Sequence, residues 1–287
     1  MSAVLFRLLR RREAALGLLY FAALVGTAVF ARLIFATDPL EQDLGNTLDP
    51  PSWDHWFGTD ELGRDLMVRT IYGARTSLLT AAGAVLIAAS VGVPVGLVAG
   101  FFGGWRDTIL MRAVDVLLAL PGILFAMALI AVLGRSQMAA LVAVGITGIP
   151  GFARITRAQV LSLRRRDFVL AVEALGGSAS YNLFRTVLPN AWSPILVQMV
   201  ILASVAILLE AALSFLGVGI PPPTPSWGDM LRTGKGFLHE APYYAVLPGV
   251  VLTCTILALD TLGRALAAVL EAGEPAEGAD GPAEEGP

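Results

Sequence analysis

Six long apolar runs dominate this chain of 287 residues, and most reach the ~20 residues that a helix needs to cross a lipid bilayer. Because 56% of the residues are hydrophobic and only 15% are charged, the chain lacks the charged surface of one soluble domain. We therefore expect an all-α polytopic membrane protein whose transmembrane domain covers residues 14–270. The six predicted spans are residues 14–36, 77–104, 108–133, 137–152, 194–219 and 245–270.

The basic residues predict the orientation of these spans. Four arginines lie in residues 1–13, ahead of the first run, as in a signal peptide or a signal anchor. The run is longer than the ~7–15 residues of a signal-peptide core, so we expect an anchor with a cytoplasmic N-terminus. Six crossings then leave thirteen arginines in inside segments, against five arginines and one lysine outside. Both termini are therefore predicted to be cytoplasmic.

Two features lie around the second span. The preceding loop, residues 37–76, is rich in Pro, Asp and Trp in its first half, while in residues 59–76 one helical stripe holds Leu62, Leu66, Arg69 and Gly73 and the acidic residues lie on other faces. This pattern predicts an interfacial helix that lies ahead of the span and orients it. Within the span, Gly92, Gly96 and Gly100 recur at spacing four, which favours close approach of another helix.

Charged residues inside the spans are costly in lipid and require an explanation. Asp115 can either face a transport path or form a local ion pair with Arg112. Glu210 can either line the outward end of such a path or hydrogen-bond to the loop that follows it, and Asp260 is the third such acid. Candidate path or gate residues are Asp115, Pro121 and Glu210.

The outer loop after the fifth span, residues 220–231, contains four prolines. Such a backbone is stiff and extended, so we expect a non-helical projection above the helix bundle. It would either re-enter the mouth of the bundle or meet a soluble partner. Its candidate residues are Pro222, Trp227 and Asp229.

The inside loop, residues 153–193, is far longer than a turn between helices requires. Phe168, Val172 and Leu175 form one apolar stripe of a short helix, which a glycine pair then ends. A second short helix is predicted up to Pro189, with Leu183, Phe184, Val187 and Leu188 on one face. Two amphipathic helices with a glycine elbow favour docking to another protein, and packing on the membrane surface is the alternative.

Several functions are excluded by what the sequence lacks. The chain has no G-x-x-x-x-G-K-[ST] loop for ATP, no H-E-x-x-H or G-x-S-x-G motif, and only one cysteine, Cys254. We therefore expect no catalytic residue, no metal site and no cofactor in this chain. No basic tract suits nucleic acid. Residues 271–287 are acidic and rich in Pro, Gly and Ala, which predicts a disordered cytoplasmic tail, with a regulatory contact as the alternative.

The inside loop resembles the EAA loop of ABC importer permeases, in which E-A-A precedes a Gly and a later Leu-Pro. Ala171, Gly176, Leu188 and Pro189 match this pattern. Leu170 stands where the family has Glu, and Glu173 is near but out of register. The loop and the resemblance together assign ATPase coupling to Phe168, Ala171, Glu173, Gly176, Gly177, Leu183, Phe184, Arg185, Leu188 and Pro189.

Residues 55–78, 101–121 and 209–231 are similar to the DppC/OppC-type permeases of dipeptide and oligopeptide importers. This resemblance implies a type I ABC importer permease fold in the bacterial inner membrane and half of a translocation path for peptides. It also implies four partners: a second DppB/OppB-like permease, two ATPases that bind ATP and Mg²⁺, and an extracytoplasmic solute-binding protein. A secondary transporter with ion coupling at intramembrane acids is the alternative.

Overall fold

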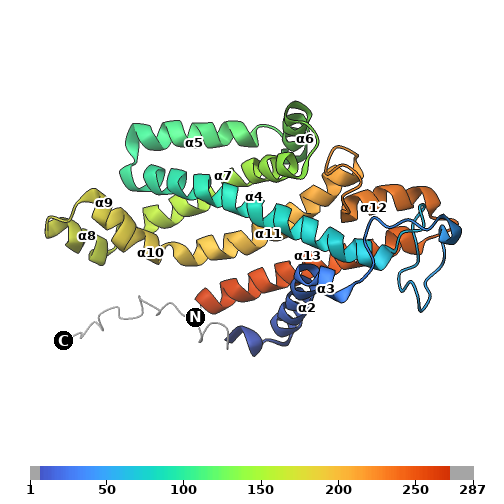
Figure 1. Cartoon of the computed structure of the whole chain (residues 1–287). Helices are drawn as coiled ribbons and strands as arrows, with labels where there is room; N and C mark the ends of the chain where they lie inside the picture. Colours follow the sequence, from blue (N-terminus) through green and yellow to red (C-terminus); the bar gives the residue numbers. More distant parts are fainter. Residues whose placement is uncertain (1–6, 272–287) are drawn as a thin grey trace, which may run out of the picture.

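The computed structural model describes residues 7–271, where the regular elements are helices (Figure 1). The long helices are α2 (Arg12–Val29), α4 (Leu66–Phe102), α5 (Gly104–Leu118), α6 (Gly122–Leu133), α7 (Gln137–Leu163), α11 (Trp192–Phe215) and α13 (Tyr243–Glu271). The short ones are α3 (Ala31–Ile34), η1 (Leu44–Asn46), α8 (Asp167–Ala174), α9 (Ala179–Tyr181), the π-helix η2 (Asn182–Val187), α10 (Leu188–Asn190), α12 (Trp227–Gly234) and η3 (Lys235–Phe237). The predicted acidic tail, residues 271–287, lies outside the described residues apart from Glu271, which ends α13.

Five of these helices are long and apolar enough to cross a membrane, namely α2, α4, α7, α11 and α13. The pair α5 and α6 meets the same test together, although the two helices are bent by 86° at the break between them. The predicted all-helical membrane fold is therefore confirmed, with five spans, or six when the broken pair is counted as one.

The helices α4, α7, α11 and α13 run along the long axis of the molecule, and α5 lies beside α4 and α7 (Figure 1). The short helices α8 to α10 gather at one end of this axis, whereas α12 and the loop before α4 lie at the opposite end. We call these two regions the knob end and the α12 end. The helix α2 packs against α13 and α4.

The contact between α4 and α7 depends on the predicted glycine stripe. A Cβ atom on Gly96 would lie 2.4 Å from the carbonyl oxygen of Ala153, and one on Gly92 would lie 2.7 Å from that of Ile149. These distances are far below van der Waals contact, so only glycine lets the two backbones come this close. The prediction of a close helix approach at this stripe is confirmed.

The local structure differs from the sequence-based expectation at three places. Residues 59–65 are a loop, and a single helix α4 starts at Leu66, where the side chain of Asp65 accepts a hydrogen bond from the backbone N–H of Val68 at 2.9 Å. The helix α7 continues to Leu163, eleven residues past the predicted span 137–152. The segment after the prolines was predicted to be extended but forms the helix α12. Ser226 caps this helix, since its hydroxyl accepts a hydrogen bond from the backbone N–H of Asp229.

Candidate functional site

The knob, residues 164–191, is anchored to the bundle by its own small core. Val169 of α8 and Leu183 and Val187 of η2 are buried in one cluster with residues of α4, α7 and α11. The side-chain amide of Asn182 donates a hydrogen bond to the carbonyl of Val169 at 3.2 Å, which joins the two short helices. The knob and the bundle therefore share a continuous core.

The outer surface of the knob carries large apolar side chains. Leu175 at the elbow is 89% exposed, and four further apolar side chains around it are exposed: Phe168, Leu170, Tyr181 and Phe184. Several large apolar side chains exposed on one small region of a folded protein are typical of an interaction site.

The predicted coupling residues divide into an exposed and an inward group. Leu183 is only 3% exposed, whereas the next residue, Phe184, is 58% exposed. The prediction that Leu183 and Phe184 share one apolar face is therefore wrong, because neighbouring residues on a helix point in different directions. Gly177 and Leu188 are half-buried, and the exposed predicted residues are Phe168, Ala171, Glu173, Gly176, Phe184, Arg185 and Pro189.

The glycine elbow of the knob has a backbone that requires glycine. Gly176 has φ of +80°, a conformation that residues with a side chain rarely adopt. A Cβ on Gly177 would lie 2.8 Å from the carbonyl oxygen of Val172. The elbow therefore has a defined shape that other residues would disturb at either position.

Glu210 is enclosed between helices α4 and α11 and is fully buried. Its carboxylate accepts hydrogen bonds from the hydroxyl of Ser77 at 2.7 Å and from that of Ser214 at 2.9 Å. The Ser214 hydroxyl in turn accepts from the backbone N–H of Ile220 in the following loop, at 3.3 Å. These contacts join α4, α11 and that loop through one carboxylate.

Asp115 of α5 forms an ion pair with Arg154 of α7 at 2.7 Å. The predicted alternative, a local pair with Arg112, is wrong, since the partner comes from another helix. Pro121 is the N-cap of α6 and lies at the 86° break between α5 and α6. The structure therefore places Asp115 and Pro121 on the same broken span, apart from the enclosed Glu210. The third intramembrane acid, Asp260, pairs with Arg264 within α13.

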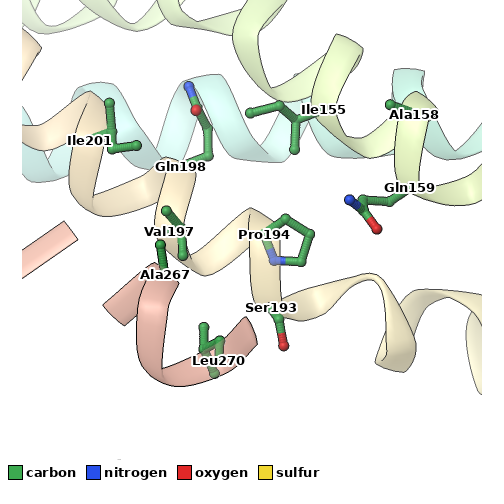
Figure 2. Close-up of a pocket in the computed structure, with 10 residues that line it drawn as sticks. All are labelled: Ile155, Ala158, Gln159, Ser193, Pro194, Val197, Gln198, Ile201, Ala267 and Leu270. Carbon is green, nitrogen blue, oxygen red and sulfur yellow. The ribbon is translucent and has the colours of Figure 1, made fainter. Parts of the chain in front are cut away.

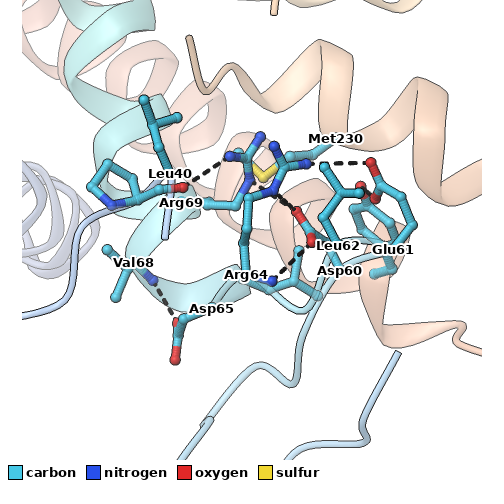
Figure 3. Close-up of polar contacts among 12 residues, drawn as sticks. Leu40, Asp60, Glu61, Leu62, Arg64, Asp65, Val68, Arg69 and Met230 are labelled. Atoms are coloured by element: carbon cyan, nitrogen blue, oxygen red, sulfur yellow. Dashed lines mark hydrogen bonds and ion pairs between the residues drawn. The ribbon is translucent and has the colours of Figure 1, made fainter. Parts of the chain in front are cut away.

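A network of buried charges holds the α12 end together, and sequence reasoning missed it. Asp60 is fully buried and pairs with Nε of Arg64 at 2.6 Å and with Nε of Arg69 at 3.3 Å (Figure 3). Arg69 also donates to the carbonyl of Pro39 at 3.0 Å, and Glu61 accepts from the hydroxyl of Tyr244 in α13. The spacing of Asp60 and Arg64 could have indicated a local ion pair. It could not have indicated the contacts with Pro39 and Tyr244, which are distant in the sequence.

Trp227 is fully buried rather than projecting into solvent, and its indole N–H donates to the carbonyl of Thr70 in α4 at 2.9 Å. Asp229 pairs with Arg232 at 2.8 Å, while Pro222 is exposed. Of the two predicted alternatives for this loop, the structure favours packing back onto the bundle for the part that contains Trp227.

A cavity of about 330 Å³ opens between α7, α11 and α13. Its polar side chains are Gln159, Gln198 and Ser193, set among apolar residues such as Ile155 and Val197 (Figure 2). Apolar walls with a few polar groups are typical of ligand sites. Within residues 7–271, no group of three or more His, Cys, Asp or Glu side chains is placed to hold a metal ion.

Residues 92–273 match a protein family described as the binding-protein-dependent transport system inner membrane component. The dipeptide transport system permease protein DppC of Alkalihalophilus pseudofirmus is 39% identical over 93% of this chain and 88% of its own length. The di/tripeptide permease DppC of Pseudomonas aeruginosa is 40% identical over 89% of this chain and 86% of its own. The oligopeptide permease OppC of Bacillus subtilis is 38% identical over 93% and 88%.

Both the family match and the relatives cover most of the chain and include the knob. They confirm the predicted resemblance and the prediction of a transport subunit rather than an enzyme. The chain therefore belongs to the family of inner membrane components of binding-protein-dependent transport systems.

Proposed function

We propose that the chain is one of two related permease subunits of an ATP-driven importer and provides half of its translocation path for peptides. The observation that carries this proposal is the knob, whose exposed apolar surface is joined to the bundle through Val169, Leu183 and Val187. Peptides are proposed as the substrate because the relatives named above are dipeptide, di/tripeptide and oligopeptide permeases.

The knob is proposed to dock on a separate ATPase subunit, which binds the ATP and Mg²⁺. When two ATPases close around ATP, each would carry its knob with it. Because packed cores move between discrete arrangements rather than deform continuously, displacement of the knob would tilt α4, α7 and α11. The path would then open to alternate sides of the membrane. In this mechanism the chain transmits the movement and catalyses no reaction.

We place the knob and both termini in the cytoplasm and the α12 end outside, facing an extracytoplasmic solute-binding protein. The excess of arginine in the segments at the knob end supports this orientation. The cavity in Figure 2 is a candidate part of the translocation path, and Gln159, Gln198 and Ser193 would then line that path. Glu210 is proposed to stabilise a gate of the path, because its hydrogen bonds with Ser77 and Ser214 join α4 and α11.

The proposal is tested by reconstituting this chain with the second permease, the ATPases and the binding protein in proteoliposomes. We expect uptake of a labelled dipeptide that needs both ATP and the binding protein. Uptake that follows an imposed ion gradient without the ATPases would instead support a secondary transporter.

The docking role is tested with Phe184→Asp. Since Phe184 is exposed, we expect unchanged thermal stability of the chain but loss of co-purification with the ATPase, because a charge would face an apolar interface. Leu44→Asp is the matched control, an exposed apolar residue of η1 in the loop before α4. ATPase binding that survives Phe184→Asp as well as it survives Leu44→Asp would contradict the assignment.

A further inference from the structure

A second, strongly charged cavity of about 650 Å³ lies between α5 and α7. Two carboxylates and three guanidinium groups line it, together with Thr108 and Met111. The charged residues are Asp107, Arg112, Asp115, Arg154 and Arg157. The cavity is therefore lined by both positively and negatively charged side chains.

The two ion pairs in this cavity differ in kind. Asp107 and Arg157 make two parallel hydrogen bonds of 2.6 Å, with side chains only 20% and 35% exposed. Asp115 and Arg154 make a single contact of 2.7 Å, and their side chains are 52% and 56% exposed. The first pair uses the full bidentate geometry and fastens α5 to α7. The second retains a free carboxylate oxygen and free guanidinium donors.

The depth of the open pair argues for an environment of water or protein. With Gln137 taken as the outer boundary, Arg154 lies about 26 Å further along α7 at about 1.5 Å per residue, close to the inner edge of the ~30 Å apolar core of a bilayer. Half-exposed charges at such depth line water or protein. The break at Pro121 ends the same α5 helix, and a broken helix is likewise tolerated only beside protein or a water-filled cavity.

We propose that this cavity is a transit site for the charged termini of a zwitterionic peptide on the wall of the aqueous path. The ammonium group would contact the free oxygen of Asp115, and the terminal carboxylate would contact Arg154 and Arg112. Within residues 7–271, Arg112 has no ion pair of its own. The site builds on the proposed peptide function and adds to it the residues that meet the substrate.

The openness of the site suits passage rather than storage. Exposed ion pairs interact weakly in water, so a peptide would be held briefly and released. An anionic lipid headgroup would suit the three arginines but would also face the carboxylates of Asp107 and Asp115, which repel it. The observed mixture of charges therefore favours a ligand that carries both signs.

The experiment compares peptide uptake with ATP hydrolysis in the complete reconstituted transporter supplied with peptide-loaded binding protein. The variants are Asp115→Asn and Arg154→Gln, and Arg106→Gln is the control, an exposed arginine of α5 outside the cavity. We expect the stimulated ATPase to stay near the wild-type rate while uptake falls roughly two- to fivefold, the change expected from the loss of one exposed charged contact. ATP hydrolysed per peptide transported would rise accordingly, and Arg106→Gln would leave that ratio unchanged.

The double variant Asp115→Asn/Arg154→Gln separates binding from a structural role. Removing both partners of a structural pair relieves the uncompensated charge and would restore uptake, whereas loss of a binding site makes the double variant at least as slow as either single one. A ratio unchanged in every variant, recovery in the double variant, or a loss that disappears in liposomes without anionic lipid would overturn the inference. Absence of peptide uptake by the wild type would instead overturn the proposed function.

Discussion

Asp115 shows what single residues in this sequence could and could not predict. The rule that charge is costly in a span singled it out, and the structure places it at a charged cavity. Its partner was predicted as Arg112 but is Arg154, which comes from α7. Spacing rules describe one helix at a time, so they cannot find a partner that only the packing of two helices brings near.

The buried network around Asp60 leads to a prediction at this scale. Asp60→Ala would leave Arg64 and Arg69 buried without their shared carboxylate, which should destabilise the chain by roughly 3–5 kcal/mol. Thermal unfolding of the purified chain in detergent measures this loss. Asp54→Ala, at an exposed position of the same loop, should change the melting temperature little. If Asp60→Ala changed the melting temperature as little as Asp54→Ala, the network would contribute no stability.

At the level of helices, apolar runs predicted which elements exist but misplaced their ends. The predicted span 137–152 stopped where Arg154 and Arg157 begin, because hydropathy treats charge as the end of a span. In the structure both arginines lie within α7, which continues to Leu163, and their charges are balanced by ion pairs with carboxylates of α5. The helix α12 was missed because the prolines before it concealed the cap at Ser226.

The glycine stripe supports a prediction about the α4 and α7 pair. Gly96→Val would place side-chain atoms against the backbone of Ala153 and should cost roughly 1–3 kcal/mol through forced separation of the helices. The loss is measured by thermal unfolding in detergent. Gly26→Val in α2 is the matched control, because a Cβ at Gly26 meets nothing within 4 Å. A control as destabilising as Gly96→Val would mean that helix contact is not the cause.

At the scale of the whole molecule, the proposed orientation predicts which end reacts with a reagent that cannot cross membranes. In a Cys254→Ala background, we expect Gly236→Cys at the α12 end to be labelled by an impermeant maleimide in right-side-out vesicles. Ser180→Cys in the knob should be labelled only in inverted vesicles. Both positions are exposed, so access to the reagent rather than burial decides the result. The reverse pattern would place the knob outside.

The break between α5 and α6 has a consequence for the life of the protein in a cell. The helix α6 has twelve residues and a length of about 18 Å, which is too short to cross the ~30 Å apolar layer alone. Water or protein must therefore lie beside the break. A copy made without the proposed second permease would present this break to lipid, which offers no partner for free backbone groups. We expect degradation of such orphan copies to keep the two proposed permease subunits in equal amounts.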